Sequence, residues 1–95
     1  MERSKKSGSW EVILSKEAAK VFDAATGDMR TRLTDCFNDL EVNPLRGKHI
    51  KKLTGKLKGR SRYRVGGWRI IYRIEEDMRT VAVIAILPRG GAYKK

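Results

Sequence analysis

The sequence has few of the residues from which metal and thiol sites are built. It contains one cysteine, Cys36, and one histidine, His49, in 95 residues. One cysteine cannot form an internal disulfide, and one histidine without further cysteines gives no set of metal ligands. We therefore expect no metal and no cofactor. Cys36 falls on the apolar side of a predicted helix and is interpreted as a buried structural residue, and His49 as a solvent-exposed loop residue.

Long apolar runs are also missing. No segment approaches the ~18 consecutive apolar residues of a membrane-spanning helix, and the charged N-terminus lacks the apolar run of a secretory signal. We expect a cytoplasmic protein that has no membrane partner. With 40% hydrophobic residues, the composition suits one small globular domain. We place this domain at residues 10–95, after a polar, flexible tail at residues 1–9.

Negative charge is scarce where positive charge is concentrated. The chain carries 22 lysine and arginine residues against 11 acidic residues, which gives a net charge of +11. Residues 10–45 hold four basic and seven acidic residues, whereas residues 46–73 hold eleven basic residues and no acid. Such a segment usually marks a polyanionic partner, most often nucleic acid, with anionic lipid or an acidic protein segment as alternatives.

Residues 60–74, RSRYRVGGWRIIYRI, predict a β-hairpin around a Gly-Gly turn at 66–67. This turn places Arg64 opposite Arg69. Because side chains alternate along a strand, apolar residues share one face, and five arginines share the other: Arg60, Arg62, Arg64, Arg69 and Arg73. Like charges directly across a ladder destabilise it by roughly 0.2–1 kcal/mol per pair. A bound anion would resolve this conflict, and arginine stems that cover apolar surface are the alternative explanation.

Periodicity and end signals predict one strand and two helices before the hairpin. Residues 10–14 predict the strand. Apolar residues at helical spacing predict a helix from the N-cap Ser15 to about Gly27, and a second helix from the N-cap Asp28 to Asn43. The second helix ends there because the residue before a proline is pushed out of the α region.

The rest of the chain predicts a loop and one more strand. Residues 45–59 are basic, contain glycines and show no clear period, which predicts a loop. Residues 80–87 are almost continuously apolar, which predicts a strand buried on both faces and ended by Pro88. The order β-α-α-β-β-β predicts an α+β fold, in which a helical hairpin packs on a four-stranded, mainly antiparallel sheet.

Four segments together resemble the RelE/ParE toxin superfamily. They are W-x-V-x-L-S-K-E-A at residues 10–18, N-P-L-R-G at 43–47, R-Y-R-V-G-x-W-R-I-I-Y at 62–72 and R-x-x-x-Y at 89–93. No single segment is specific, but their order and spacing are. The resemblance implies the toxin of a type II toxin–antitoxin pair, held inactive by a cognate antitoxin. The RelE branch cleaves messenger RNA in the ribosomal A site, whereas the ParE branch inhibits DNA gyrase.

Carried over by position, the resemblance implies a catalytic site without carboxylates. Arg69 and Arg89 would hold the scissile phosphate, Arg62 and Arg64 would bind substrate, and Tyr93 would transfer protons. RNA supplies its own nucleophile, the 2′-hydroxyl group. Because arginine stays protonated, it is a poor general base, and more of the proton transfer falls to Tyr93. Neighbouring cations favour the ionised form of a tyrosine and so suit it to this role.

Other basic residues are expected to contact the phosphate backbone of messenger or ribosomal RNA, with strong salt dependence: Lys48, Lys51, Lys52, Lys56, Lys58 and Arg60. The favoured hypothesis is a ribosome-dependent, metal-independent endoribonuclease. A ParE-like gyrase inhibitor is the alternative, and a family member that only binds RNA or antitoxin is the third. The antitoxin segment is expected to combine acidic residues with apolar anchors and to lie over the arginine face and the helical pair.

Overall fold

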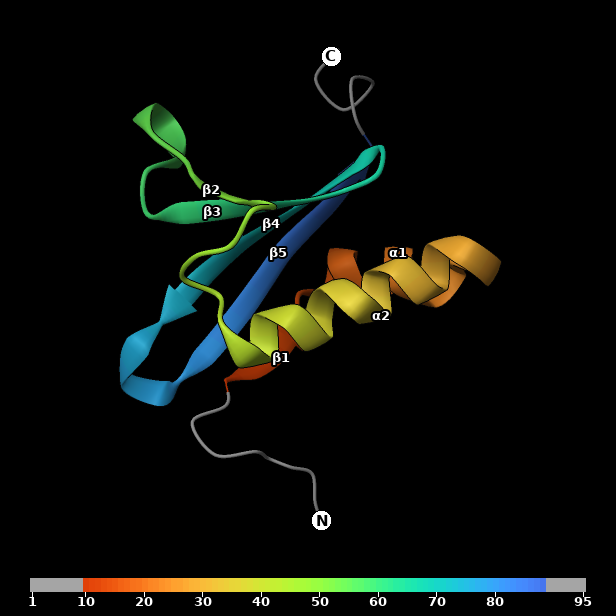
Figure 1. Cartoon of the computed structure of the whole chain (residues 1–95), viewed down its shortest axis with the longest axis horizontal. Coiled ribbons are helices and arrows are strands. Elements are labelled where there is room, and N and C mark those ends of the chain that lie inside the picture. Colours follow the sequence, from red (N-terminus) through yellow and green to blue (C-terminus); the bar gives the residue numbers. More distant parts are fainter. Residues whose placement is uncertain (1–9, 89–95) are drawn as a thin grey trace.

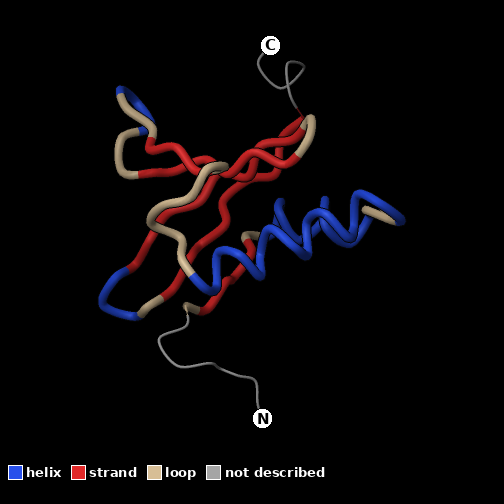
Figure 2. Tube along the Cα trace, viewed as in Figure 1, coloured by secondary structure: helices blue, strands red, loops and turns tan. Residues whose placement is uncertain are grey.

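The computed structural model describes residues 10–88, in which two helices lie on one face of a five-stranded sheet (Figure 1). The helices are α1 (Lys16–Ala24) and α2 (Gly27–Val42); the strands are β1 (Glu11–Leu14), β2 (Ile50–Lys52), β3 (Arg60–Val65), β4 (Trp68–Glu75) and β5 (Thr80–Pro88). Two short 3-10 helices, η1 (Gly55–Leu57) and η2 (Glu76–Met78), lie in the β2–β3 and β4–β5 connections (Figure 2). No helix within residues 10–88 is long and apolar enough to cross a membrane.

The sheet is mostly antiparallel, as predicted. Its strand order is β1-β5-β4-β3-β2, and only β1 and β5 pair in parallel. The α+β class and the order of the predicted elements are confirmed. The predicted number of four strands is wrong, because a fifth strand lies in the predicted loop at residues 45–59.

This additional strand, β2, pairs antiparallel with the outer edge of β3. Hydrogen bonds extend the pairing at both ends: Arg64 N donates to His49 O at 3.0 Å, and Leu53 N donates to Arg60 O at 2.9 Å. Three residues are too few to show an alternating pattern in a sequence. The strand forms because the edge of β3 offers it backbone partners.

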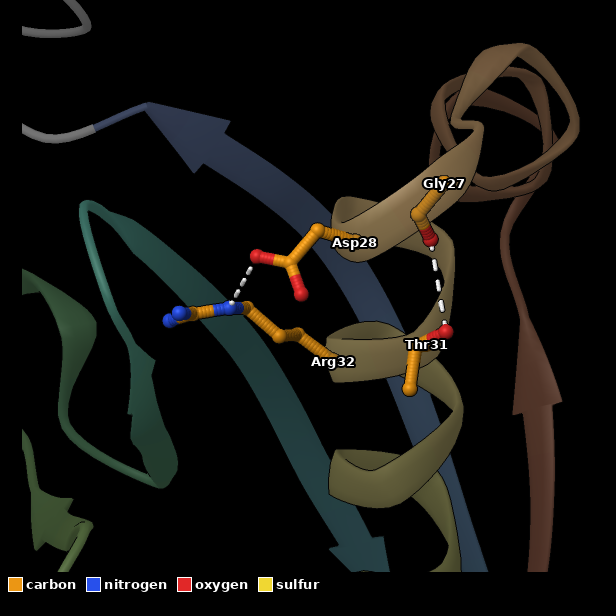
Figure 3. Close-up of polar contacts among 4 residues, drawn as sticks. All are labelled: Gly27, Asp28, Thr31 and Arg32. Carbon is orange, nitrogen blue, oxygen red and sulfur yellow. Dashed lines mark hydrogen bonds and ion pairs between the residues drawn. The ribbon is translucent and has the colours of Figure 1, made fainter.

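The two helices begin differently. Ser15 is the N-cap of α1, as predicted: its Oγ accepts a hydrogen bond from Ala18 N at 3.0 Å. The prediction of Asp28 as the N-cap of α2 is wrong, because Thr26 takes that position and Gly27, at φ +54°, begins the helix. Asp28 lies in the first turn and accepts a hydrogen bond from Arg32 Nε at 2.9 Å (Figure 3).

The core lies between the helices and the sheet. Its buried members come from both layers: Trp10, Ala18, Leu33, Cys36, Leu40, Tyr63, Val65, Ile70, Tyr72, Val81, Val83 and Ile86. Cys36 is only 1% exposed, and burial raises the pKa of its thiol far above the ordinary range, with Asp39 adding to the effect. A thiol that stays protonated is a poor nucleophile, so the structural interpretation of Cys36 is confirmed.

Strand β5 is an interior strand, but it is buried on one face only. Val81, Val83 and Ile86 are buried in the core, whereas Ala82 and Leu87 are half-buried. The prediction of burial on both faces is wrong because both helices cover the same side of the sheet (Figure 1). Pro88 belongs to the strand as its last residue instead of following it.

Candidate nucleic-acid interface

The β3–β4 hairpin has the register that the sequence predicted. Arg64 lies opposite Arg69 and Arg60 lies opposite Arg73. Gly66 in the turn has φ +54°, a conformation that favours glycine. Tyr63, Val65, Ile70 and Tyr72 belong to the core under the helices, so strand alternation directs the arginines to the uncovered side of the sheet, called here the open face.

The five arginines of the open face differ in their surroundings. Arg73 donates to Glu75 Oε2 from Nε at 2.9 Å and from Nη2 at 2.7 Å, which compensates its charge. Arg60 and Arg62 are half-buried, and the Nε atoms of both are buried with no hydrogen-bond partner within residues 10–88. A buried donor without a partner costs roughly 1–3 kcal/mol.

An apolar band lies beside the arginines on the open face. Ile71 lies between Arg62 on one side and Ala85 on the other, and Leu87 lies opposite Arg69. These aliphatic residues are half-buried and stand outside the core cluster. The open face is therefore cationic over β3 and aliphatic toward β5.

A pocket of about 240 Å³ lies where β2 meets β3. It is called here the β2–β3 pocket, and its lining residues are Lys48, His49, Ile50, Lys51, Arg62 and Arg64. Strand pairing places Lys51 directly opposite Arg62. The structure thus brings two of the predicted RNA-binding lysines together with two of the predicted catalytic arginines.

Other predicted contact residues lie away from this pocket. Lys52 pairs with Ser61 and so falls on the opposite side of the sheet from Lys51. Lys56 lies in η1 and Lys58 follows it, in a connection that projects from the body of the protein (Figure 1). Predicted residues Arg89 and Tyr93, with the tail at 1–9, lie outside the described residues.

His49 is a member of the pocket that the sequence interpretation missed. Its side chain is exposed, as predicted, but its ring lies against Tyr63, with centroids 5.4 Å apart and planes tilted by 41°. The hydroxyl of Tyr63 donates a hydrogen bond to the carboxylate of Asp39 in α2. Burial first, and this hydrogen bond second, raise the pKa of Tyr63 above its ordinary range, so the phenol stays a neutral donor.

The chemistry offered by this site is cationic. Within residues 10–88, no group of three or more His, Cys, Asp or Glu side chains is placed to hold a metal ion. The pocket instead presents two ammonium groups, two guanidinium groups and an imidazole. Such a set binds oxyanions and stabilises negative charge that develops on them.

A helical hairpin on a mostly antiparallel sheet is a fold shared with solved structures of RelE-type toxins. The family model described as "ParE toxin of type II toxin-antitoxin system, parDE" matches residues 12–93. The chain therefore belongs to the ParE toxin family of type II toxin–antitoxin systems. Among curated protein sequences, none matches this chain.

Solved structures of three toxins share the fold. The RelBE2 toxin–antitoxin complex from Mycobacterium tuberculosis is similar with 23% identity and a TM-score of 0.74, over 85% of this chain and 99% of that one. An archaeal RelE-RelB complex from Pyrococcus horikoshii also has 23% identity and a TM-score of 0.74, over 86% and 97%. The isolated E. coli RelE toxin has 17% identity and a TM-score of 0.71, over 84% of each chain. The TM-scores show that the fold is shared, and at identities of this size the likeness extends to the fold alone.

Proposed function

We propose that this toxin is a ribosome-dependent endoribonuclease that cleaves messenger RNA and so inhibits translation. The observation that carries the proposal is the gathering of Arg62, Arg64 and Arg69 on one open sheet face. The sequence around them, residues 46–73, contains no acid. The cations of such a surface attract the phosphates of a nucleic-acid backbone, and residues 46–73 contain no carboxylate that would repel them.

The proposed reaction requires two things of the protein: cations that stabilise charge on the phosphate, and one group that transfers a proton. The 2′-hydroxyl group attacks the adjacent phosphorus, the bond to the 5′-oxygen of the next nucleotide breaks, and a 2′,3′-cyclic phosphate and a 5′-hydroxyl remain. Because the nucleophile belongs to the substrate, no metal-activated water is required. Arg69, with Arg89, would stabilise charge on the phosphate, and Tyr93 would move the proton.

The surroundings of the site also support the proposed partners. An antitoxin segment with acidic residues and apolar anchors would match the cationic and aliphatic halves of the open face. Lys52, Lys56 and Lys58 lie on or near the projecting β2–β3 connection and would contact ribosomal RNA. This activity belongs in the cytoplasm, where translating ribosomes are found.

Primer extension on a defined messenger RNA, with and without translating ribosomes, tests the proposal. We expect cuts that need the ribosome and that leave 2′,3′-cyclic phosphate ends. Loss of one group that stabilises the transition state costs about 10²- to 10³-fold in rate, so Arg69→Gln should reduce cutting by that factor, and Tyr93→Phe should weaken it. Lys20→Gln, an exposed change in α1, is the charge-matched control. Undiminished cutting by an Arg69→Gln, Tyr93→Phe double variant would refute the proposed mechanism.

Gyrase inhibition is a second candidate function, favoured by the match to the ParE family model. This activity would need no RNA chemistry. It predicts inhibition of DNA supercoiling by purified gyrase, and toxicity that survives the Arg69→Gln and Tyr93→Phe changes. A toxin that leaves supercoiling intact and cuts RNA on ribosomes would exclude it.

A further inference from the structure

The β2–β3 pocket contains a histidine to which the proposed reaction gives no role. We propose that this pocket binds one backbone phosphate of a single-stranded polynucleotide and that the imidazole of His49 contacts that phosphate. The inference rests on the proposed function and extends it, because this phosphate lies next to the one held by Arg69. The pocket would thus fix the position of the strand on the toxin.

The shape and charge of the pocket support a phosphate as its occupant. The pocket has a volume of about 240 Å³. Besides His49, four cationic residues and one aliphatic residue line it. An oxyanion in the pocket lies within reach of several charges at once.

Spacing along β3 supports a polynucleotide rather than an isolated anion. Arg60, Arg62 and Arg64 alternate with core residues, so successive arginines stand about 6.8 Å apart along the strand. This repeat is similar to the separation of successive phosphates in an extended nucleic-acid strand.

His49 is held at the pocket from two sides. Its carbonyl oxygen accepts the hydrogen bond from Arg64 N at 3.0 Å, and its ring lies against Tyr63 at 5.4 Å between centroids. Tyr63 is in turn tied to α2 by its hydrogen bond to Asp39. The imidazole therefore keeps its place at the pocket although it is open to solvent.

The charges around His49 set the expected pH dependence. Lys48, Lys51, Arg62 and Arg64 line the same pocket; the phenol of Tyr63 is neutral, and the carboxylate of Asp39 lies behind it. A phosphate group beside an imidazole favours its protonated form. Phosphate binding should therefore be accompanied by uptake of a proton by His49. Binding should strengthen as the pH falls through the range in which histidine titrates and weaken as the pH rises.

Because the chain has one histidine, nuclear magnetic resonance of the imidazole nitrogens reports on this site alone. The probe is a single-stranded 2′-deoxy tetranucleotide, which has no 2′-hydroxyl group and cannot be cleaved. We expect saturating probe to move the midpoint of the imidazole titration upward by about half a unit to one unit, and affinity to be about three- to tenfold higher at pH 5.5 than at pH 8. Inorganic phosphate at the same concentration should produce a smaller response.

Three variants make the test specific. His49→Gln should abolish the pH dependence of binding, and Arg62→Gln should weaken binding and reduce the shift of the imidazole midpoint, whereas Lys20→Gln in α1 should change neither. An unchanged imidazole midpoint at saturation, absence of binding, or pH dependence that persists in His49→Gln would overturn the proposal. An equal response to inorganic phosphate would overturn the assignment to a polynucleotide.

The outcomes separate this inference from the proposed function. A clear response of His49 to the uncleavable probe, without any RNA cleavage on ribosomes, would support the pocket and reject the nuclease. Ribosome-dependent cleavage, together with an imidazole midpoint that the probe does not change, would support the nuclease activity and reject phosphate binding in the pocket.

Discussion

Replacing Arg64 by glutamine is expected to make the protein more stable and less able to bind RNA. Arg64 is exposed and lies directly opposite Arg69 on the neighbouring strand. Two like charges in this arrangement destabilise a sheet by about 0.2–1 kcal/mol. Glutamine is neutral and keeps the aliphatic part of the side chain as far as Cγ, so Arg64→Gln removes the repulsion together with the guanidinium group.

The expected gain is measurable by thermal unfolding. For a domain of this size, 1 kcal/mol corresponds to about 4–8 °C in Tm, so the variant should melt roughly 1–8 °C higher at low salt. Salt screens exposed charges over about 10 Å at 0.1 M, and the difference should shrink as salt is added. Arg64→Lys, which keeps the charge, should melt close to the wild type.

The second arginine pair tests the same reasoning. Arg73, opposite Arg60, already has its charge compensated by Glu75. Arg73→Gln removes an ion pair together with the repulsion and should give no gain in Tm.

Binding should move in the opposite direction from stability. If Arg64 contacts a phosphate, its loss reduces the slope of log affinity against log salt by about 0.7 for a single strand. Titration of a fluorescent 2′-deoxy oligonucleotide at several salt concentrations measures this slope. A Tm that falls in Arg64→Gln, together with an unchanged salt slope, would show that Arg64 serves the fold and not an anion.

Three further predictions concern the fold around the site. Tyr63→Phe removes the hydrogen bond to the Asp39 carboxylate and should cost about 1–3 kcal/mol in urea unfolding; an unchanged midpoint would show that this contact adds nothing. Gly66→Ala should cost about 1–2 kcal/mol because of the positive φ. An added Cβ would also come within 2.8 Å of Arg32 Nη1, but that flexible group can move, so rescue by Arg32→Ala would contradict the backbone explanation. Burial raises the pKa of Tyr72 to about 12, whereas the tyrosine of the unfolded chain ionises near pH 10. The contribution of Tyr72 to the free energy of unfolding should therefore be constant up to about pH 10. It should then fall by about 1.4 kcal/mol per pH unit until about pH 12. Tyr72→Phe, followed by urea unfolding between pH 9 and pH 11.5, should show a smaller loss, and an equal loss would contradict the assignment.

Local patterns determined most of the elements and the cationic face. The Gly-Gly turn and the two-residue alternation around it set the register of the β3–β4 hairpin, and this register alone places Arg64 opposite Arg69. The apolar spacing of α1 and α2 and the cap at Ser15 set the helices. These features depend on neighbours in sequence, so they can be predicted without knowledge of the rest of the fold.

Tertiary structure decided what depends on distant partners. Strand β2 exists because the edge of β3 accepts it, and that pairing turns a basic loop into a pocket in which His49 stands beside Arg62 and Arg64. The one-sided burial of β5 follows from the placement of both helices on the same face. The ion pair between Arg73 and Glu75 compensates the charge of one arginine on the open face. Composition and spacing thus determined that this protein has a cationic sheet face, whereas the pocket arose from contacts between segments that no local pattern connects.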